Sequence, residues 1–240
     1  MIPIINIRDM RHSLPSERGL LLVIKQKQNT MKKLNKHITA FTFMIAAIFL
    51  GAIAQNAMAQ STYKLFADKD ASIKVLGSSN VHDWTMASQS MESQGEFKLD
   101  NEGQLRSLSS FSFSLEAKSL KSEHSSMDDR TYKTMKADQF PKVTYKLSSA
   151  VITPVQKNKY SIKTTGELTI AGVSQTITMV VTAVINPDNT ITCSGSEALK
   201  LTDYKIDPPS FMLGAMKVKN DFTIQFNLGY KNNQLISKAN

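Results

Sequence analysis

Five residues near polar motifs have side chains of the kinds used in catalysis or metal binding: His82, Asp83, His124, Asp128 and Cys193. The spacing of the first four matches no known set of metal ligands. The sequence also lacks the H-E-x-x-H, G-x-S-x-G, P-loop, G-x-G-x-x-G and C-x-x-C-H motifs. We therefore expect a protein that is not an enzyme and has no cofactor. The alternative is a hydrolase or metal-dependent enzyme that uses His82 and Asp83.

Cys193 is the only cysteine, so an intrachain disulfide is excluded. In the run TITCSGS it alternates with Ile191, which places both side chains on one face of a strand. No general base lies beside it in the sequence, as a cysteine nucleophile would need. A buried, unreactive thiol is the expected state, and a reactive thiol is the alternative.

Residues 31–59 have the pattern of a secretory signal peptide. A start methionine and three lysines come first, an apolar run follows from 38 to 54, and an A-x-A cleavage sequence ends the segment. We expect residues 1–30 to be a mis-assigned upstream extension and the mature protein to begin near Gln60, in the periplasm or outside the cell. The alternative is an uncleaved anchor, because a membrane span takes about 20 apolar residues.

The positive charge lies mainly in this leader. Residues 1–59 hold eight Lys/Arg and two Asp/Glu, so +6 of the net charge of +9 lies there and +3 in residues 60–240. No cluster of Lys and Arg in the mature chain could follow a phosphate backbone. No nucleic-acid partner is expected, and no stable membrane span should remain after cleavage.

Apolar and polar residues alternate with period two along most of the mature chain, as is typical of β-strands. The alternating runs are 72–76, 92–99, 111–117, 143–148, 160–163, 174–186, 190–200 and 222–228. Turn-forming residues separate them at 100–103, 156–158, 171–172 and 186–189. About eight long antiparallel strands must hide their edges, and closure does so. The sequence predicts an all-β, antiparallel, eight-stranded barrel.

Two segments interrupt this pattern. Residues 125–138 predict a short helix, capped by Ser125 or Ser126. The connection 203–219 has no clean period but is too apolar for a solvated loop. Its residues Phe211, Met212 and Met216 are expected either to form an adaptable lid or to close the barrel end as core residues.

Five motifs stand in an order that resembles the YceI-like family. They are SSNVHDW (78–84), a G-x-F strand (95–97), MDDRTYKTMKADQFPKVTY (127–145), GELTIAGVSQTITM (166–179) and LTDYKIDPPSFMLGAMKVKNDFTIQFNL (201–228). The resemblance covers about residues 61–230 and leaves 231–240 as a polar tail. It implies a lipocalin-like barrel around an apolar tunnel, export, and binding of a long amphiphilic ligand such as a polyisoprenoid, a prenyl quinone or a fatty amide.

In such a barrel the ligand-binding residues would be Phe111, Phe113, Val143, Tyr145, Tyr160, Ile162 and Phe226, with Phe211, Met212 and Met216 over the opening. Each buried CH₂ contributes roughly 0.8 kcal/mol. A few prenyl units thus give a gross gain on the order of 10 kcal/mol, which ordering and association costs reduce. The alternative is a solid core in a structural or stress-associated envelope protein. A homodimer is compatible with either.

Three residues are candidates for contact with a ligand head group: His82, Trp84 and Arg130. His82 could instead be a structural hydrogen-bonding residue. Arg130 could instead pair with an aspartate. In the family an Arg-Asp pair precedes the helix, whereas here Asp128 and Asp129 come before the arginine. His124 is expected to be a solvated loop residue.

Overall fold

The computed structural model describes residues 61–66 and 71–233. The predicted upstream extension and signal peptide lie outside the described residues. The strands are β1 (Ser61–Leu65), β2 (Ser72–Ser79), β3 (Asp83–Ser88), β4 (Met91–Leu99), β5 (Leu105–Glu116), β6 (Lys142–Gln156), β7 (Lys159–Ile170), β8 (Val173–Ile185), β9 (Ile191–Lys200), β10 (Ser210–Phe211) and β11 (Met216–Asn232). The helices are α2 (Ser125–Thr134) and the 3₁₀ turns η1 (Ala117–Ser119), η2 (Leu201–Tyr204) and η3 (Met212–Gly214).

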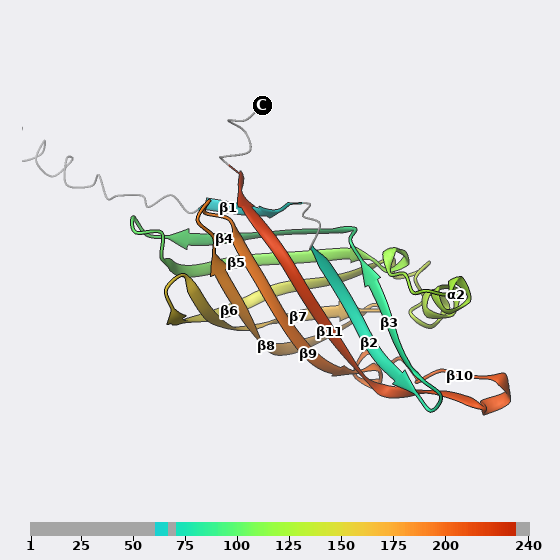
Figure 1. Ribbon diagram of the computed structural model, residues 1–240. Helices are drawn as coiled ribbons and strands as arrows, with labels where there is room; N and C mark the ends of the chain where they lie inside the picture. The colour runs from blue at the N-terminus through green and yellow to red at the C-terminus, as the bar shows by residue number, and fades with distance from the viewer. Residues whose placement is uncertain (1–60, 67–70, 234–240) are drawn as a thin grey trace, which may run out of the picture. The chain divides into compact units, whose positions relative to one another are not determined.

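Eight strands close into an antiparallel barrel (Figure 1). Neighbours around the ring follow the order β1-β4-β5-β6-β7-β8-β9-β11, and pairing of β11 with β1 completes it. The closing pairs join Tyr63 to Asn232 and Leu65 to Tyr230. The predicted lipocalin-like barrel of eight strands with one short α-helix is therefore confirmed for the described part of the chain.

Strand pairing is less complete at the end of the barrel that carries α2. There β2 and β3 extend the wall beyond β1 and β4, because β11 pairs with β2 and β2 with β3. An isolated bridge from Ala87 to Lys121 links β3 to the segment after β5, so the wall opens between these two strands. β8 and β9 pair through Val181–Ile185 and Ile191–Gly195, and their remaining halves separate. This end of the barrel is therefore its open mouth.

Two β-bulges decide which residues face inward. The pairs Gly95–Phe111 and Phe97–Leu108 place an extra residue in β5, so that Phe111 and Leu108 both reach the interior. A similar shift after Leu147 in β6 turns Val151 outward, where it is 62% exposed. At both bulges the strict alternation of inward and outward side chains is interrupted.

The end of the barrel away from α2 is filled by its own side chains. Tyr63, Phe97, Phe111 and Tyr230 form a chain of ring contacts with centroids 5.5 to 5.8 Å apart. The rings of Tyr63, Phe97 and Tyr230 are at most 3% exposed. Beyond them Tyr160 is buried, and its hydroxyl accepts a hydrogen bond from the Leu105 amide at 3.1 Å. The interior is consequently closed at this end.

All eight alternating runs lie within observed strands, apart from one or two residues at run ends. The sequence does not predict β1, β3 or β10, which are short and lack clear alternation. The connection 203–219 is less irregular than expected, since it contains β10 and η3 and β11 begins at Met216. β11 also reaches Asn232, into the segment expected to be a polar tail.

The predicted helix is shorter than expected and differently capped. α2 ends at Thr134, and His124 stands at its N-cap without a side-chain cap hydrogen bond. Neither Ser125 nor Ser126 caps it. Among the described residues, no helix has the length and apolar character that crossing a membrane requires.

Candidate ligand-binding site

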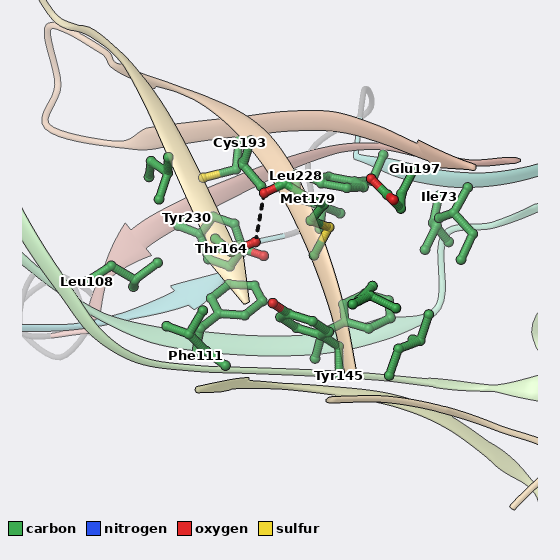
Figure 2. Close-up of a pocket in the computed structure, with 18 of the residues that line it drawn as sticks. Ile73, Leu108, Phe111, Tyr145, Thr164, Met179, Cys193, Glu197, Leu228 and Tyr230 are labelled. Carbon is green, nitrogen blue, oxygen red and sulfur yellow. Dashed lines mark hydrogen bonds between the residues drawn. The ribbon is translucent and has the colours of Figure 1, made fainter. Parts of the chain in front are cut away.

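The middle of the barrel contains an apolar cavity of about 100 Å³ (Figure 2). Alternating residues of β5, β6, β7, β8, β9 and β11 point into it, because each strand presents every second side chain to the interior. The lining includes Leu108, Phe111, Phe113, Tyr145, Leu147, Ile162, Leu168, Ile177, Met179, Val181, Leu199, Phe226 and Leu228. An engineered apolar cavity of about 150 Å³ stays dry and binds benzene. The inner cavity therefore has room for a short apolar group.

Besides Cys193 and Tyr230, three side chains with polar groups interrupt this lining, and Figure 2 shows them among the apolar groups. The hydroxyl of Thr164 donates to the Met179 carbonyl at 3.3 Å. Among the described residues, no side chain or backbone group forms a well-aligned hydrogen bond with the buried hydroxyl of Tyr145. Burial raises the pKa of Tyr145, and the neighbouring Thr164 hydroxyl partly offsets this. The Tyr145 hydroxyl is thus a donor in the inner cavity that could form a hydrogen bond to an oxygen atom of a ligand.

Glu197 is the third polar group and brings a carboxyl to the interior. It faces inward on β9 with Cys193 and Leu199, where β8 and β9 separate. Among the described residues it forms no ion pair, and burial raises its pKa. The gap between the strands explains why the carboxyl is only partly buried.

A second, wider cavity of about 320 Å³ lies at the mouth. It is enclosed by β2, β3, β11, α2 and the β10 segment, and its volume falls in the range of roughly 300–1,000 Å³ that is typical of ligand sites. Ile73, Val143 and Ile224 line both cavities. The two spaces are therefore adjacent along the barrel, separated by these side chains.

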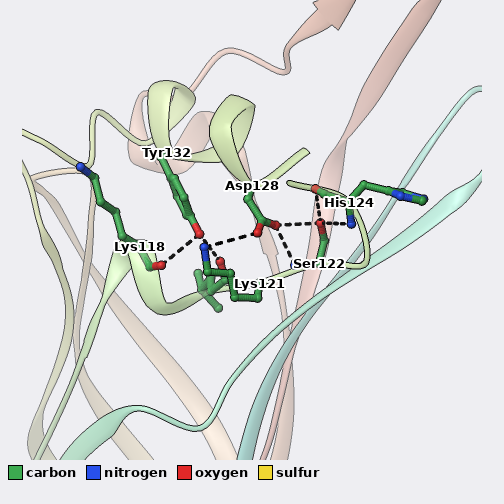
Figure 3. A network of polar contacts seen from close by, with 7 residues as sticks. Lys118, Lys121, Ser122, His124, Asp128 and Tyr132 are labelled. Atoms are coloured by element: carbon green, nitrogen blue, oxygen red, sulfur yellow. Dashed lines mark hydrogen bonds and ion pairs between the residues drawn. The ribbon is translucent and has the colours of Figure 1, made fainter. Parts of the chain in front are cut away.

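A polar network holds α2 over this cavity (Figure 3). The backbone amide and hydroxyl of Ser122 donate to Asp128 Oδ1 at 2.7 and 2.8 Å. Lys121 Nζ lies 3.5 Å from Asp128 Oδ2, and the Tyr132 hydroxyl donates to the carbonyl of Leu120 at 2.7 Å. Burial of Asp128 opposes its ionisation, but the donors from Ser122 and the charge of Lys121 outweigh it, so its pKa is lowered.

Arg130 connects α2 to β10 across the mouth. Its guanidinium carbon lies 4.6 Å from the centroid of the Phe211 ring, and both residues line the mouth cavity. Among the described residues Arg130 forms no ion pair. The alternative that it pairs with an aspartate is wrong, because Asp128 is used by Ser122 and Lys121.

Trp84 lines the mouth cavity from β3. It is the cross-strand partner of Gly77, and a methyl group on Gly77 would overlap the indole ring. The ring therefore lies against bare backbone, and its buried Nε1 has no hydrogen-bond partner in the part of the chain that the structure describes. This N–H is an unsatisfied donor at the mouth.

The two histidines also line the mouth cavity and are exposed. His82 Nδ1 lies 2.8 Å from the carbonyl oxygen of Asp83, and the backbone amide of His82 donates to the Ser79 hydroxyl at 3.1 Å. Among the described residues, neither Asp nor Glu lines this cavity, so the polar groups found there are donors, hydroxyls and a cation. Within the described part of the chain, no three His, Cys, Asp or Glu residues are placed to hold a metal ion.

The structure divides the predicted ligand-binding residues between the two cavities. Phe111, Phe113, Tyr145, Ile162 and Phe226 line the inner one, and Val143 lines both. The mouth cavity is lined by Phe211, Met216, His82, Trp84 and Arg130. Tyr160 and Met212 line neither: Tyr160 belongs to the filled end, and Met212 is 72% exposed.

Several lining residues are absent from the sequence prediction although the same alternation contains them. Continuing the Ile191–Cys193 alternation along β9 reaches Glu197 and Leu199. Met127 of α2 and Met135, which directly follows the helix, had no comparable signal, because their role depends on where the helix packs. Cys193 is buried as expected, and burial raises the pKa of its thiol to about 12.

A family model described as a YceI-like domain matches residues 66–230. No curated protein sequence matches the chain. The structure is similar to that of BcnA from Burkholderia cenocepacia, with 25% sequence identity, a TM-score of 0.51, and coverage of 65% of this chain and 95% of BcnA. It is also similar to a polyisoprenoid-binding domain from Saccharophagus degradans, described as implicated in plant cell wall breakdown. That match has 13% identity, a TM-score of 0.52 and coverage of 72% and 99%, and shows a shared fold.

Proposed function

The chain belongs to the YceI-like domain family, and on this premise we propose that it is an exported carrier that binds one long apolar lipid of the isoprenoid type. The polyisoprenoid-binding domain from Saccharophagus degradans supports this ligand class. The signal-peptide pattern of residues 31–59 supports export to the periplasm or the exterior. Sequencing the N-terminus of the exported protein would test the leader, and a start near Gln60 is expected.

The observation that carries the proposal is the pair of adjacent apolar cavities in a barrel sealed at one end. The inner cavity has an almost wholly apolar lining, and the mouth cavity adjoins it at Ile73, Val143 and Ile224, which line both. Adjacent apolar cavities of this kind stabilise an aliphatic chain by removing it from water. It favours a carrier over the alternative of a solid-core structural protein.

The polar groups indicate how the ligand is oriented. Within the part of the chain that the structure describes, the mouth offers donors from Trp84 Nε1, Arg130 and the histidines, and no carboxylate lines it. The inner cavity is small and mostly apolar, so it suits the end of an aliphatic tail. We therefore place the end of the tail in the inner cavity, most of the chain in the mouth cavity, and an oxygen-rich head group beside Trp84 and Arg130. This arrangement needs binding and orientation, and assigns no catalytic residue.

Native mass spectrometry of the exported, gently purified protein tests the proposal, with organic extraction to identify what is released. A bound apolar molecule is expected in the wild type. Val143→Phe adds bulk between the cavities and should abolish it, whereas Val151→Phe lies on the outer face of the same strand and should not. Wild-type protein that never carries such a molecule, and takes up no farnesol when mixed with it, would contradict the carrier function.

A further inference from the structure

The most exposed apolar side chains in the described chain lie beside the mouth. Met212 is 72% exposed and Leu213 111% exposed, at the tip of the hairpin that joins β10 to β11. Figure 1 shows this hairpin projecting beyond the turn between β2 and β3. Large apolar side chains held fully in water forgo the stabilisation that burial would bring.

The backbone holds these two residues in an unusual conformation. Met212 and Leu213 have φ angles of 54° and 57°, in the left-handed region that residues other than glycine rarely adopt. The conformation is maintained by the hairpin, in which Ser210 pairs with Lys217 and Phe211 with Met216. Backbone strain of this kind persists where surrounding structure enforces it, often at functional sites.

Asn80 fastens the tip to the neighbouring turn. Its side chain donates to the Ala215 carbonyl at 2.9 Å and accepts from the Lys217 amide at 2.7 Å. The next residue, Val81, is 61% exposed. Two adjacent loops therefore present three exposed apolar side chains from one braced unit, here called the apolar tip: Val81, Met212 and Leu213.

The apolar tip is continuous with the proposed lipid site. Phe211 and Met216, on either side of the exposed pair, line the mouth cavity. In residues 80–83 and 205–219 the cations are Lys205, Lys217 and Lys219, against the carboxylates of Asp83 and Asp207. The surroundings of the tip thus carry a small excess of positive charge, which suits anionic lipid head groups.

The small size of the apolar tip favours a lipid surface over a protein as its partner. A stable protein interface buries about 800 Å² on each side and draws on some twenty or more residues. Three side chains on two adjacent loops present much less. Peripheral proteins, in contrast, associate with bilayers through a limited apolar surface together with attraction to anionic lipids.

We propose that the apolar tip docks the barrel mouth on an anionic lipid bilayer, so that a lipid passes between membrane and cavity without crossing water. The role of the docking rests on the proposed carrier function, although the docking itself does not require a loaded protein. Leu213 and Met212 enter the interface, and Lys205, Lys217 and Lys219 lie at the level of the head groups.

Co-sedimentation with vesicles tests this directly. Residues 60–240 should bind vesicles made of equal parts phosphatidylglycerol and phosphatidylcholine more tightly than vesicles of phosphatidylcholine alone. The double substitution Met212→Ser and Leu213→Ser should lower binding on the order of tenfold. Val151→Ser with Val155→Ser, which removes two exposed apolar groups from β6, should leave it unchanged.

Loss of binding in the tip variant with an unchanged melting temperature supports the proposal. Equal binding of the tip variant and the wild type overturns it, as does a wild type that binds neither vesicle. Farnesol uptake from solution, measured on the same proteins, separates this result from the carrier function. The tip variant should take up farnesol normally, because Met212 and Leu213 line neither cavity.

Discussion

The guanidinium of Arg130 lies over the ring of Phe211, 4.6 Å from its centroid, and this contact joins α2 to β10 across the mouth of the barrel. The two residues lie on segments far apart in the chain, and both line the mouth cavity. The contact therefore fastens α2 to the β10 segment at this cavity.

Removing this contact should speed ligand release. A cation–π contact at an exposed site contributes roughly 0.5–1 kcal/mol, which corresponds to about two- to fivefold in a rate. Phe211→Ala and Arg130→Ala should each accelerate farnesol dissociation by that factor, followed through the fluorescence of Trp84, the only tryptophan. Met212→Ala serves as the control, since it lines neither cavity, and the same release rate in all four proteins would contradict the prediction.

Asp128 should be a main anchor of α2. Asp128→Asn weakens the ion pair with Lys121 and the charge-assisted bonds from Ser122, at a cost of about 1–3 kcal/mol. For a domain of this size each kcal/mol lowers the melting temperature by about 2–4 °C. Asp129→Asn changes the exposed neighbour and should have little effect, so calorimetry of the two variants gives a matched comparison.

The same aspartate gives stability a defined pH dependence. Because the pKa of Asp128 is lowered in the folded state, its contribution is present above the unfolded value and is lost as pH falls through the folded value. Urea denaturation at decreasing pH should show the wild type and Asp128→Asn converging. A difference that stays constant in acid would mean that ionisation of Asp128 is not the cause.

Glu197 should produce the opposite dependence. Its pKa is raised above the ordinary 4.5 by burial, so the folded state keeps a proton that the unfolded chain has released. Stability due to this group therefore falls as pH rises through that window. Glu197→Gln should be more stable than the wild type at neutral pH and equal to it in acid, as measured by urea denaturation.

An exposed glutamate on the outer face of β7 provides a control for this prediction. Glu167 of β7 is exposed, and Glu167→Gln should not alter the pH profile. If both substitutions act alike, general surface charge is responsible, and the inward carboxyl has no special role.

Gly77 should be indispensable to the position of Trp84. A methyl group at Gly77 overlaps the indole, so Gly77→Ala must displace the ring or the strand, at a cost of about 1–3 kcal/mol. We expect a shifted Trp84 emission maximum and weaker farnesol binding. Trp84→Phe should reduce the cost of Gly77→Ala, and strictly additive effects in this double-mutant cycle would argue against the overlap.

Most strands could be predicted because alternation is a local property. Residues 143–148 and 222–228 show the period of two directly, and the turn after residue 170 contains Gly172, whose positive φ angle suits glycine. The bulges in β5 and β6 could not be predicted in this way. They depend on the register between strands, and they decide that Leu108 faces in and Val151 faces out.

The sequence by itself therefore determined the class of fold, the aromatic and aliphatic faces of the strands, and the burial of Cys193, because these follow from spacing along one strand. Only the tertiary structure decided that the interior is filled at one end and hollow at the other, and that Arg130 meets Phe211 where an aspartate was the alternative partner. It also decided that Met212 points into solvent, whereas Phe211 lines the cavity. Each of these depends on contacts between residues far apart in the chain, whose geometry arises when the barrel closes.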